Sequence, residues 1–192
     1  MRLSLLFFVV SGLYAQGTEL GLTLGRILPR QRGELDLQGG LALQANYGKR
    51  VWTGQGLALF GEGHLLASPL REVTTANPRA ARDFASLYLM PGLRLQFGPE
   101  RRWRPFVAGG VGYAQYHSSE LLQNGAPSPV RDRQHTWGGN YGGGMDVQVL
   151  RWLAVRGEVR NFVTPSPRLN TPLTGTQQNV VVSGGFVLRL TR

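Results

Sequence analysis

The chain has 192 residues, a length that suits one domain of ordinary size. Its formal net charge is +10, and arginine carries almost all of the positive charge because Lys49 is the only lysine. Charged residues make up 17% of the chain, below the share of about a quarter that is usual in soluble domains. The sequence has no cysteine, which excludes disulfides and thiolate chemistry.

The N-terminal stretch MRLSLLFFVVSGLYAQ has the pattern of a secretory signal peptide. Arg2 is followed by the apolar run 3–10 and then by a small residue, Ala15, at the expected cleavage site. An N-terminal membrane anchor is the alternative, but the run is far shorter than the ~20 residues that span a bilayer as a helix. We therefore predict a signal peptide over residues 1–15 and a single exported domain over residues 16–192.

From Gln16 onward, apolar residues recur at every second position, which indicates β-strands rather than helices. Each stretch is close to the length that crosses a bilayer as a tilted strand. Eight strands are predicted, at residues 18–26, 35–47, 57–67, 85–97, 105–116, 137–149, 153–161 and 180–190.

The connections between these strands alternate between two kinds. The stretches 48–56, 98–104 and 150–152 are short, whereas 68–84, 117–134 and 164–178 are long and rich in Pro, Asn, Ser and Arg. The first connection on the long-loop side, 27–34, is the one brief loop there. Short turns on one rim and long loops on the other are typical of bacterial transmembrane barrels, in which the short turns lie in the periplasm.

The stretch SLYLMPGLRLQF at residues 86–97 raises the question of which strand face points inward. Its leucines lie on one face and Arg94 on the other. A soluble lipocalin-like barrel would turn the leucines inward to form a ligand cavity. A membrane barrel would turn them toward lipid and Arg94 into the lumen.

The residue types on the second face favour the membrane barrel. They are mostly Gly, Ala, Ser, Gln and Asn, which suit the narrow interior of an eight-stranded barrel. The few charges have both signs, and we interpret them as a lumenal charge network in which carboxylates pair with arginines. A selectivity lining for a pore is the alternative, but eight strands leave no continuous water channel. The predicted members are Glu19, Asp36, Glu62, Arg94, Asp146, Arg156, Glu158, Arg160 and Arg189.

The four tryptophans lie where strands are predicted to end. Trp52, Trp103 and Trp152 each fall at a short turn, and Trp137 falls at the opposite rim. Tryptophan favours the membrane–water interface because its ring is apolar and its N–H seeks water. We predict that all four are membrane-interface aromatics, although chance placement or packing under loops would give the same spacing.

Three stretches resemble the small outer-membrane β-barrel proteins of the OmpA/OmpW-like group: RPFVAGGVGYA (104–114), GGGMDVQVLRWLAVRGEVRNF (142–162) and VVVSGGFVLRL (180–190). The resemblance spans most of the mature chain and concerns architecture rather than a specific function. It implies assembly by the barrel assembly machinery, location in the bacterial outer membrane and a monomeric state. The chain differs from such barrels in ending Thr191-Arg192 instead of an aromatic residue. Because no peptidoglycan-binding domain follows the barrel, a wall-tethering role is not expected.

Two groups of histidines are candidate chemical sites. Some outer-membrane barrels of this size modify lipid A acyl chains, and Glu62, His64 and Ser68 could supply an acid, a base and a nucleophile. Residues four apart on one strand are ~13 Å apart, however, so His64 and Ser68 are not neighbours. His117 and His135 lack a third ligand for a metal. We predict no catalytic residue, no metal and no cofactor.

Arginines in the long loops suggest a partner. A high pI often indicates nucleic-acid binding, but export argues against it. Outside an outer membrane, Arg71, Arg79 and Arg82 would instead meet lipopolysaccharide phosphates, which arginine binds in bidentate fashion. The sequence thus predicts an all-β, eight-stranded antiparallel up-and-down transmembrane barrel with a structural or surface-interaction role. A lipid A-modifying enzyme and a soluble carrier are the alternatives.

Overall fold

The computed structural model describes residues 17–30, 36–74, 83–118, 122, 124–126, 133–165 and 176–190. The predicted signal peptide lies outside these ranges. All the secondary-structure elements in the described ranges are β-strands. These ranges contain no helix that is long and apolar enough to cross a membrane. The strands are β1 (Thr18–Arg30), β2 (Asp36–Leu37), β3 (Gly40–Gly54), β4 (Leu57–Thr74), β5 (Asp83–Phe97), β6 (Trp103–Ser118), β7 (Arg133–Gln148), β8 (Leu153–Pro165) and β9 (Thr176–Leu190).

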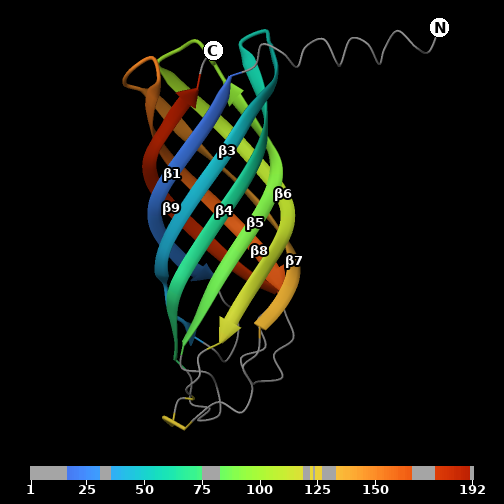
Figure 1. Cartoon of the computed structure of the whole chain (residues 1–192), viewed down its shortest axis with the longest axis vertical. Coiled ribbons are helices and arrows are strands. Elements are labelled where there is room, and N and C mark those ends of the chain that lie inside the picture. The colour runs from blue at the N-terminus through green and yellow to red at the C-terminus, as the bar shows by residue number, and fades with distance from the viewer. Residues whose placement is uncertain are drawn as a thin grey trace, which may run out of the picture.

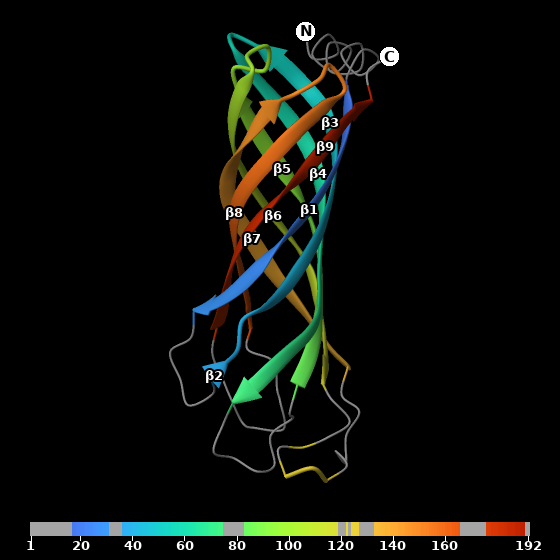
Figure 2. The ribbon, with the colours of Figure 1, turned by 90° about the vertical axis from the view of Figure 1, so that its left-hand side faces the viewer.

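The eight long strands form a closed antiparallel barrel. Each pairs with its neighbours in the order β4-β3-β1-β9-β8-β7-β6-β5, and β4 pairs with β5 to close the ring. The strands are strongly tilted, and the start of β1 and the end of β9 lie on the rim that carries the short turns (Figure 1). The predicted eight-stranded up-and-down barrel is therefore confirmed. The short strand β2 adds to the edge of β4 near the opposite rim (Figure 2).

The two faces of the strands have the predicted orientation. In β5, Leu89 and Leu93 are exposed on the outside, whereas Arg94 is buried inside the barrel. The same alternation runs through β1, where Leu22 is exposed and Glu19 is buried. The outer surface is apolar and the lumen is polar.

Several strands are longer than predicted. Residues 48–54 continue β3, so the turn predicted over 48–56 shrinks to Gln55 and Gly56. These two residues have φ angles of 52° and 76°, the left-handed conformation of a tight hairpin turn that matches the twist of the strands. Likewise, β4 continues to Thr74 into the predicted long loop.

Two bulges interrupt the regular alternation. Arg50 lies opposite Phe60 and Trp52 opposite Leu59, so Val51 is an extra residue in β3. In β4, Ser68 lies opposite Ser86 and Arg71 opposite Phe84, which leaves two residues of β4 opposite one of β5. A bulge reverses the face to which the following side chains point. Trp52 therefore points outward and Arg71 inward.

Pro91 lies within β5, and proline interrupts a strand ladder because it has no N–H to donate. Between the paired residues Leu89–Tyr113 and Gly92–Gly110, the ladder from β5 to β6 has no pairing at Met90 and Pro91. The ladder from β5 to β4 continues through Pro91 without a shift. Pairing is therefore lost locally on only one side of the strand.

Candidate functional site

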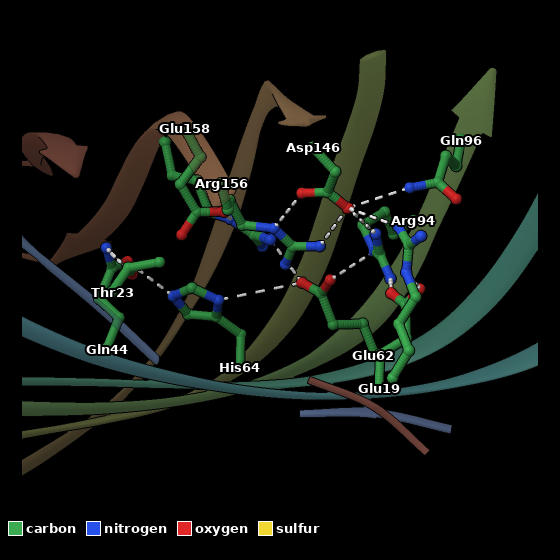
Figure 3. Close-up of polar contacts among 12 residues, drawn as sticks. Glu19, Thr23, Gln44, Glu62, His64, Arg94, Gln96, Asp146, Arg156 and Glu158 are labelled. Carbon is green, nitrogen blue, oxygen red and sulfur yellow. Dashed lines mark hydrogen bonds and ion pairs between the residues drawn. The ribbon is translucent and has the colours of Figure 1, made fainter. Parts of the chain in front are cut away.

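A buried network of acidic and basic side chains fills the lumen (Figure 3). It holds four arginines and four carboxylates, so its formal charge is balanced. Eight of the nine predicted members take part, and the side chain of Asp36 lies outside the described parts. The participating residues are Glu19 on β1, Glu62 on β4, Arg94 on β5, Asp146 on β7, Arg156, Glu158 and Arg160 on β8, and Arg189 on β9.

Asp146 is the centre of this network and is fully buried. It accepts two hydrogen bonds from Arg156, from Nε at 2.7 Å and from Nη2 at 2.9 Å. Gln96 donates to the same carboxylate at 3.0 Å and Arg94 at 3.4 Å. One carboxylate thus connects three strands, β5, β7 and β8.

Two further carboxylates extend the network toward the rims. On the short-turn side, Glu19 accepts from both Arg94 and Arg189, the latter at 3.0 Å. On the long-loop side, Glu62 lies 3.1 Å from Arg94 Nε and accepts from Arg160 at 2.5 Å. Arg160 also donates to Glu158 at 3.2 Å. Every network arginine therefore has at least one carboxylate partner.

Two phenylalanines pack against the guanidinium groups. The Arg94 guanidinium lies 4.2 Å from the centre of the Phe60 ring and 5.4 Å from that of Phe106. Arg156 lies 4.8 Å from the centre of the same Phe106 ring. These cation–π contacts fill the space between the charges with apolar atoms and leave less room for water.

His64 continues the polar contacts toward the long-loop rim. Its Nε2 is hydrogen-bonded to Gln44 Oε1 at 2.9 Å, and Gln44 donates to Thr23 at 3.1 Å and to Ser183 at 2.6 Å. The other ring nitrogen lies 3.9 Å from Glu62. Gln44 and Gln96 were not among the predicted site residues. Both nevertheless fall on the strand face that carries the polar residues, so the alternation places them on the inner face.

The candidate acid, base and nucleophile of an acyl-chain enzyme lie inside the lumen. Glu62, His64 and Ser68 are all buried on the inner face of β4. Glu62 is engaged by arginines and His64 by Gln44, and the Ser68 hydroxyl has no hydrogen-bond partner in the structure. The hydroxyl is not activated by the histidine, and none of the three side chains faces lipid.

Two predicted site residues lie elsewhere. The backbone of Asp36 pairs opposite Thr74, twelve residues along β4 from Glu62, so this residue lies at the long-loop rim and not at the network. Arg71 is 1% exposed and points into the barrel, so its side chain does not face outward from the loops as the prediction had assumed. Arg79 and Arg82 lie outside the described residues.

The remaining histidines are on the long-loop side. His135 is hydrogen-bonded to the hydroxyl of Tyr113 and stacks on its ring at 5.5 Å, and His117 lies opposite Arg133. Within the described ranges, no group of three or more His, Asp or Glu side chains is placed to hold a metal ion.

All four tryptophans are exposed on the outer surface. Trp103 begins β6, and ten residues later Tyr113 lies opposite Trp137 on β7. Ten strand residues span ~33 Å, which corresponds to ~25 Å along the barrel axis at a tilt of ~40°. That height equals the apolar band of outer-membrane barrels.

No family model and no curated protein matches the chain. Solved structures that are similar to it over nearly their full length include the following three. Neisserial surface protein A is 10% identical, with a TM-score of 0.58 and coverage of 91% of this chain and 97% of the other. The outer membrane protein OprG of Pseudomonas aeruginosa is 14% identical, with a TM-score of 0.59 and coverage of 93% and 97%. The N-terminal β-barrel domain of Pseudomonas aeruginosa OprF is 12% identical, with a TM-score of 0.50 and coverage of 90% and 97%.

At these identities the likeness concerns the fold. It agrees with the predicted resemblance and with the predicted location in a bacterial outer membrane. The chain has the fold of the small outer-membrane β-barrels.

Proposed function

We propose that this protein is a monomeric outer-membrane barrel with a closed lumen, so it does not act as a pore. Its role is structural, within the membrane, or consists of surface interactions at the long-loop rim. The observation that carries this proposal is the hydrogen bond of 2.5 Å from Arg160 to Glu62. Their strands, β8 and β4, are four positions apart in a ring of eight, so they lie on opposite walls. Side chains that meet across the full width of the lumen leave no continuous channel at that level.

The outer surface supports membrane placement. Leu22 is 67% exposed and Val111 is 73% exposed, and they belong to a belt of large apolar side chains around the barrel. Soluble monomers rarely expose contiguous apolar surface of this kind. The polar, filled lumen also disfavours a soluble carrier, which would need an apolar cavity inside.

The lumenal position of Glu62, His64 and Ser68 disfavours lipid A chemistry. An acyl hydrolase or transferase must present its nucleophile to a lipid at the outer surface, and these side chains are enclosed by the barrel wall. A role in membrane integrity, adhesion or partner contact through the long-loop rim is the function that we favour.

Lipopolysaccharide and the barrel assembly machinery remain the proposed partners. With Arg71 inside the barrel, the proposed lipopolysaccharide contacts on the outside of the long loops are Arg79 and Arg82. Replacing both with serine is expected to reduce the lipopolysaccharide that co-purifies with the protein. Unchanged co-purification would contradict this contact.

Two measurements test the closed barrel. The protein is expected to fractionate with outer membranes and to migrate differently on gels before and after heating. In planar bilayers it should show no stable conductance steps, whereas the double variant E62A/R160A should admit ions. Stable steps from the unaltered protein would overturn the closed lumen, and soluble fractionation would overturn the membrane placement.

A further inference from the structure

A second polar cluster lies in the lumen between the charge network and the long-loop rim. It comprises Ser68 and Arg71 on β4 and Ser86 on β5, next to the aromatic side chains of Phe84 and Tyr116. The bulge after Ser68 turns Arg71 inward, so that both β4 side chains project from the same face of the wall.

Arg71 differs from every arginine of the charge network. It is 1% exposed, its Nε donates to the carbonyl oxygen of Gln38 at 3.4 Å, and its guanidinium lies 4.9 Å from the centre of the Phe84 ring. Nη1 and Nη2 are buried without a hydrogen-bond partner. In the described part of the chain, no carboxylate lies within ion-pair distance of it.

Two buried hydroxyls without a hydrogen-bond partner lie on the inner face of the same two strands, β4 and β5. Ser68 and Ser86 lie directly opposite each other on β4 and β5, and both hydroxyl oxygens are buried without a partner. Arg71 and Phe84 form the next inward-facing pair along the same two strands. Residues in such positions are neighbours on one face of a sheet, so the register places Arg71 and the two serines at adjacent inward-facing positions.

The groups beside this cluster are already paired with one another. The Tyr116 hydroxyl is bonded to Thr164 at 2.5 Å, Tyr88 donates to Tyr116 at 3.3 Å, and Asn179 donates to Tyr88 at 3.1 Å. This series of hydrogen bonds lies beside Ser86, because Tyr116 on β6 is the residue directly opposite Ser86. The donors of Arg71, Ser68 and Ser86 are therefore left over after the internal pairing.

A buried guanidinium without a counter-charge is strongly unfavourable, and buried donors without acceptors add to that cost. An oxyanion would supply the missing charge and the acceptors together. The planar fork of arginine matches two oxygens of a phosphate, and serine hydroxyls can donate to the others. We propose that Arg71, Ser68 and Ser86 form a lumenal binding site for an oxyanion of phosphate or sulfate chemistry, either free or as part of a lipopolysaccharide headgroup.

The test is a titration of the purified protein in detergent at constant ionic strength. Sodium phosphate should raise the unfolding temperature and broaden the phosphorus-31 resonance of the added phosphate, and sodium chloride at equal ionic strength should do neither. The variant R71M should lose both effects, and S68A/S86A should raise the Kd for phosphate by about tenfold, as expected when hydroxyl donors to a charged group are removed. The control R102M removes an exposed arginine near the opposite rim and should keep both effects.

A second titration with purified lipopolysaccharide separates the two sources. An Arg71-dependent shift with inorganic phosphate supports a free anion, and one with lipopolysaccharide alone supports a headgroup phosphate. The proposal is overturned if neither ligand gives a shift beyond that of chloride, or if the shift persists in R71M. If R71M fails to fold, an unchanged phosphate affinity in S68A/S86A would overturn the proposed binding site.

Discussion

Asp146 and Arg156 face each other across β7 and β8 and share two nearly parallel hydrogen bonds of 2.7 and 2.9 Å. This bidentate geometry is the strongest form of an arginine–carboxylate pair. Since Asp146 also accepts from Arg94 and Gln96, the pair links the walls of the lumen to one another.

Removing this carboxylate should destabilise the barrel strongly. The variant D146A leaves Arg156 without its bidentate partner, and breaking a buried pair in this way costs about 3–5 kcal/mol. The free energy of unfolding, measured by urea titration with the heat-dependent gel shift as readout, checks this. The matched control E72A removes an exposed carboxylate on β4 and should change stability by less than about 0.5 kcal/mol. A loss below about 1 kcal/mol in D146A would contradict the central role of this residue.

The outer face should reject charge according to depth. Val107 is exposed on β6 about midway between Trp103 and Tyr113, so V107R would place a cation near the centre of the apolar band. The expected cost is about 2–4 kcal/mol for V107R but only about 0–1 kcal/mol for V149R, which lies at the short-turn rim. Unfolding in lipid vesicles compares the two variants. Equal costs would mean that the band is not centred where the tryptophans indicate.

The fold could be predicted because lipid and lumen demand opposite chemistry on alternate residues. A leucine next to an arginine, as in Leu93 and Arg94, has only one orientation that keeps the charge away from lipid. Small residues on the inner face then indicated a narrow barrel with a filled lumen. These are local patterns, which is why they can be read without knowledge of the strand pairing.

The features that could not be predicted depend on register. The bulge after Ser68 reverses the face of Arg71, and the bulge at Val51 shifts the register of β3 against β4. Pro69 was a signal for the first bulge, because proline within a sheet is largely confined to edges and bulges. The partner of each charge also depends on the stagger of the closed ring, which brings Arg160 to Glu62 although 98 residues separate them. Predicting one strand over 35–47 placed Asp36 near the network, whereas β2 and β3 are separate strands.

Two glycines on neighbouring strands should respond oppositely to a methyl group. A Cβ at Gly185 would lie 2.0 Å from the carbonyl oxygen of Leu22, so G185A must push β1 and β9 apart. A Cβ at Gly157 would meet no atom within 4 Å. We expect G185A to lose about 1–3 kcal/mol, as overpacking does, and G157A to gain up to about 1 kcal/mol from reduced freedom of the unfolded chain. Urea titration measures the free energy of unfolding of both variants. Equal stabilities would contradict the close approach of β1 to β9.

The tryptophans should report the two edges of the membrane. Variants that keep a single tryptophan, with the other three changed to phenylalanine, would be placed in vesicles of lipids brominated at known depths. Trp103 and Trp137 are exposed near opposite ends of the barrel, so each should be quenched most by bromines near the headgroups. The matched control is V107W in a background without other tryptophans, which should be quenched most by bromines deep in the acyl chains. Strongest quenching of Trp103 or Trp137 by deep bromines would show that the apolar band lies elsewhere along the barrel.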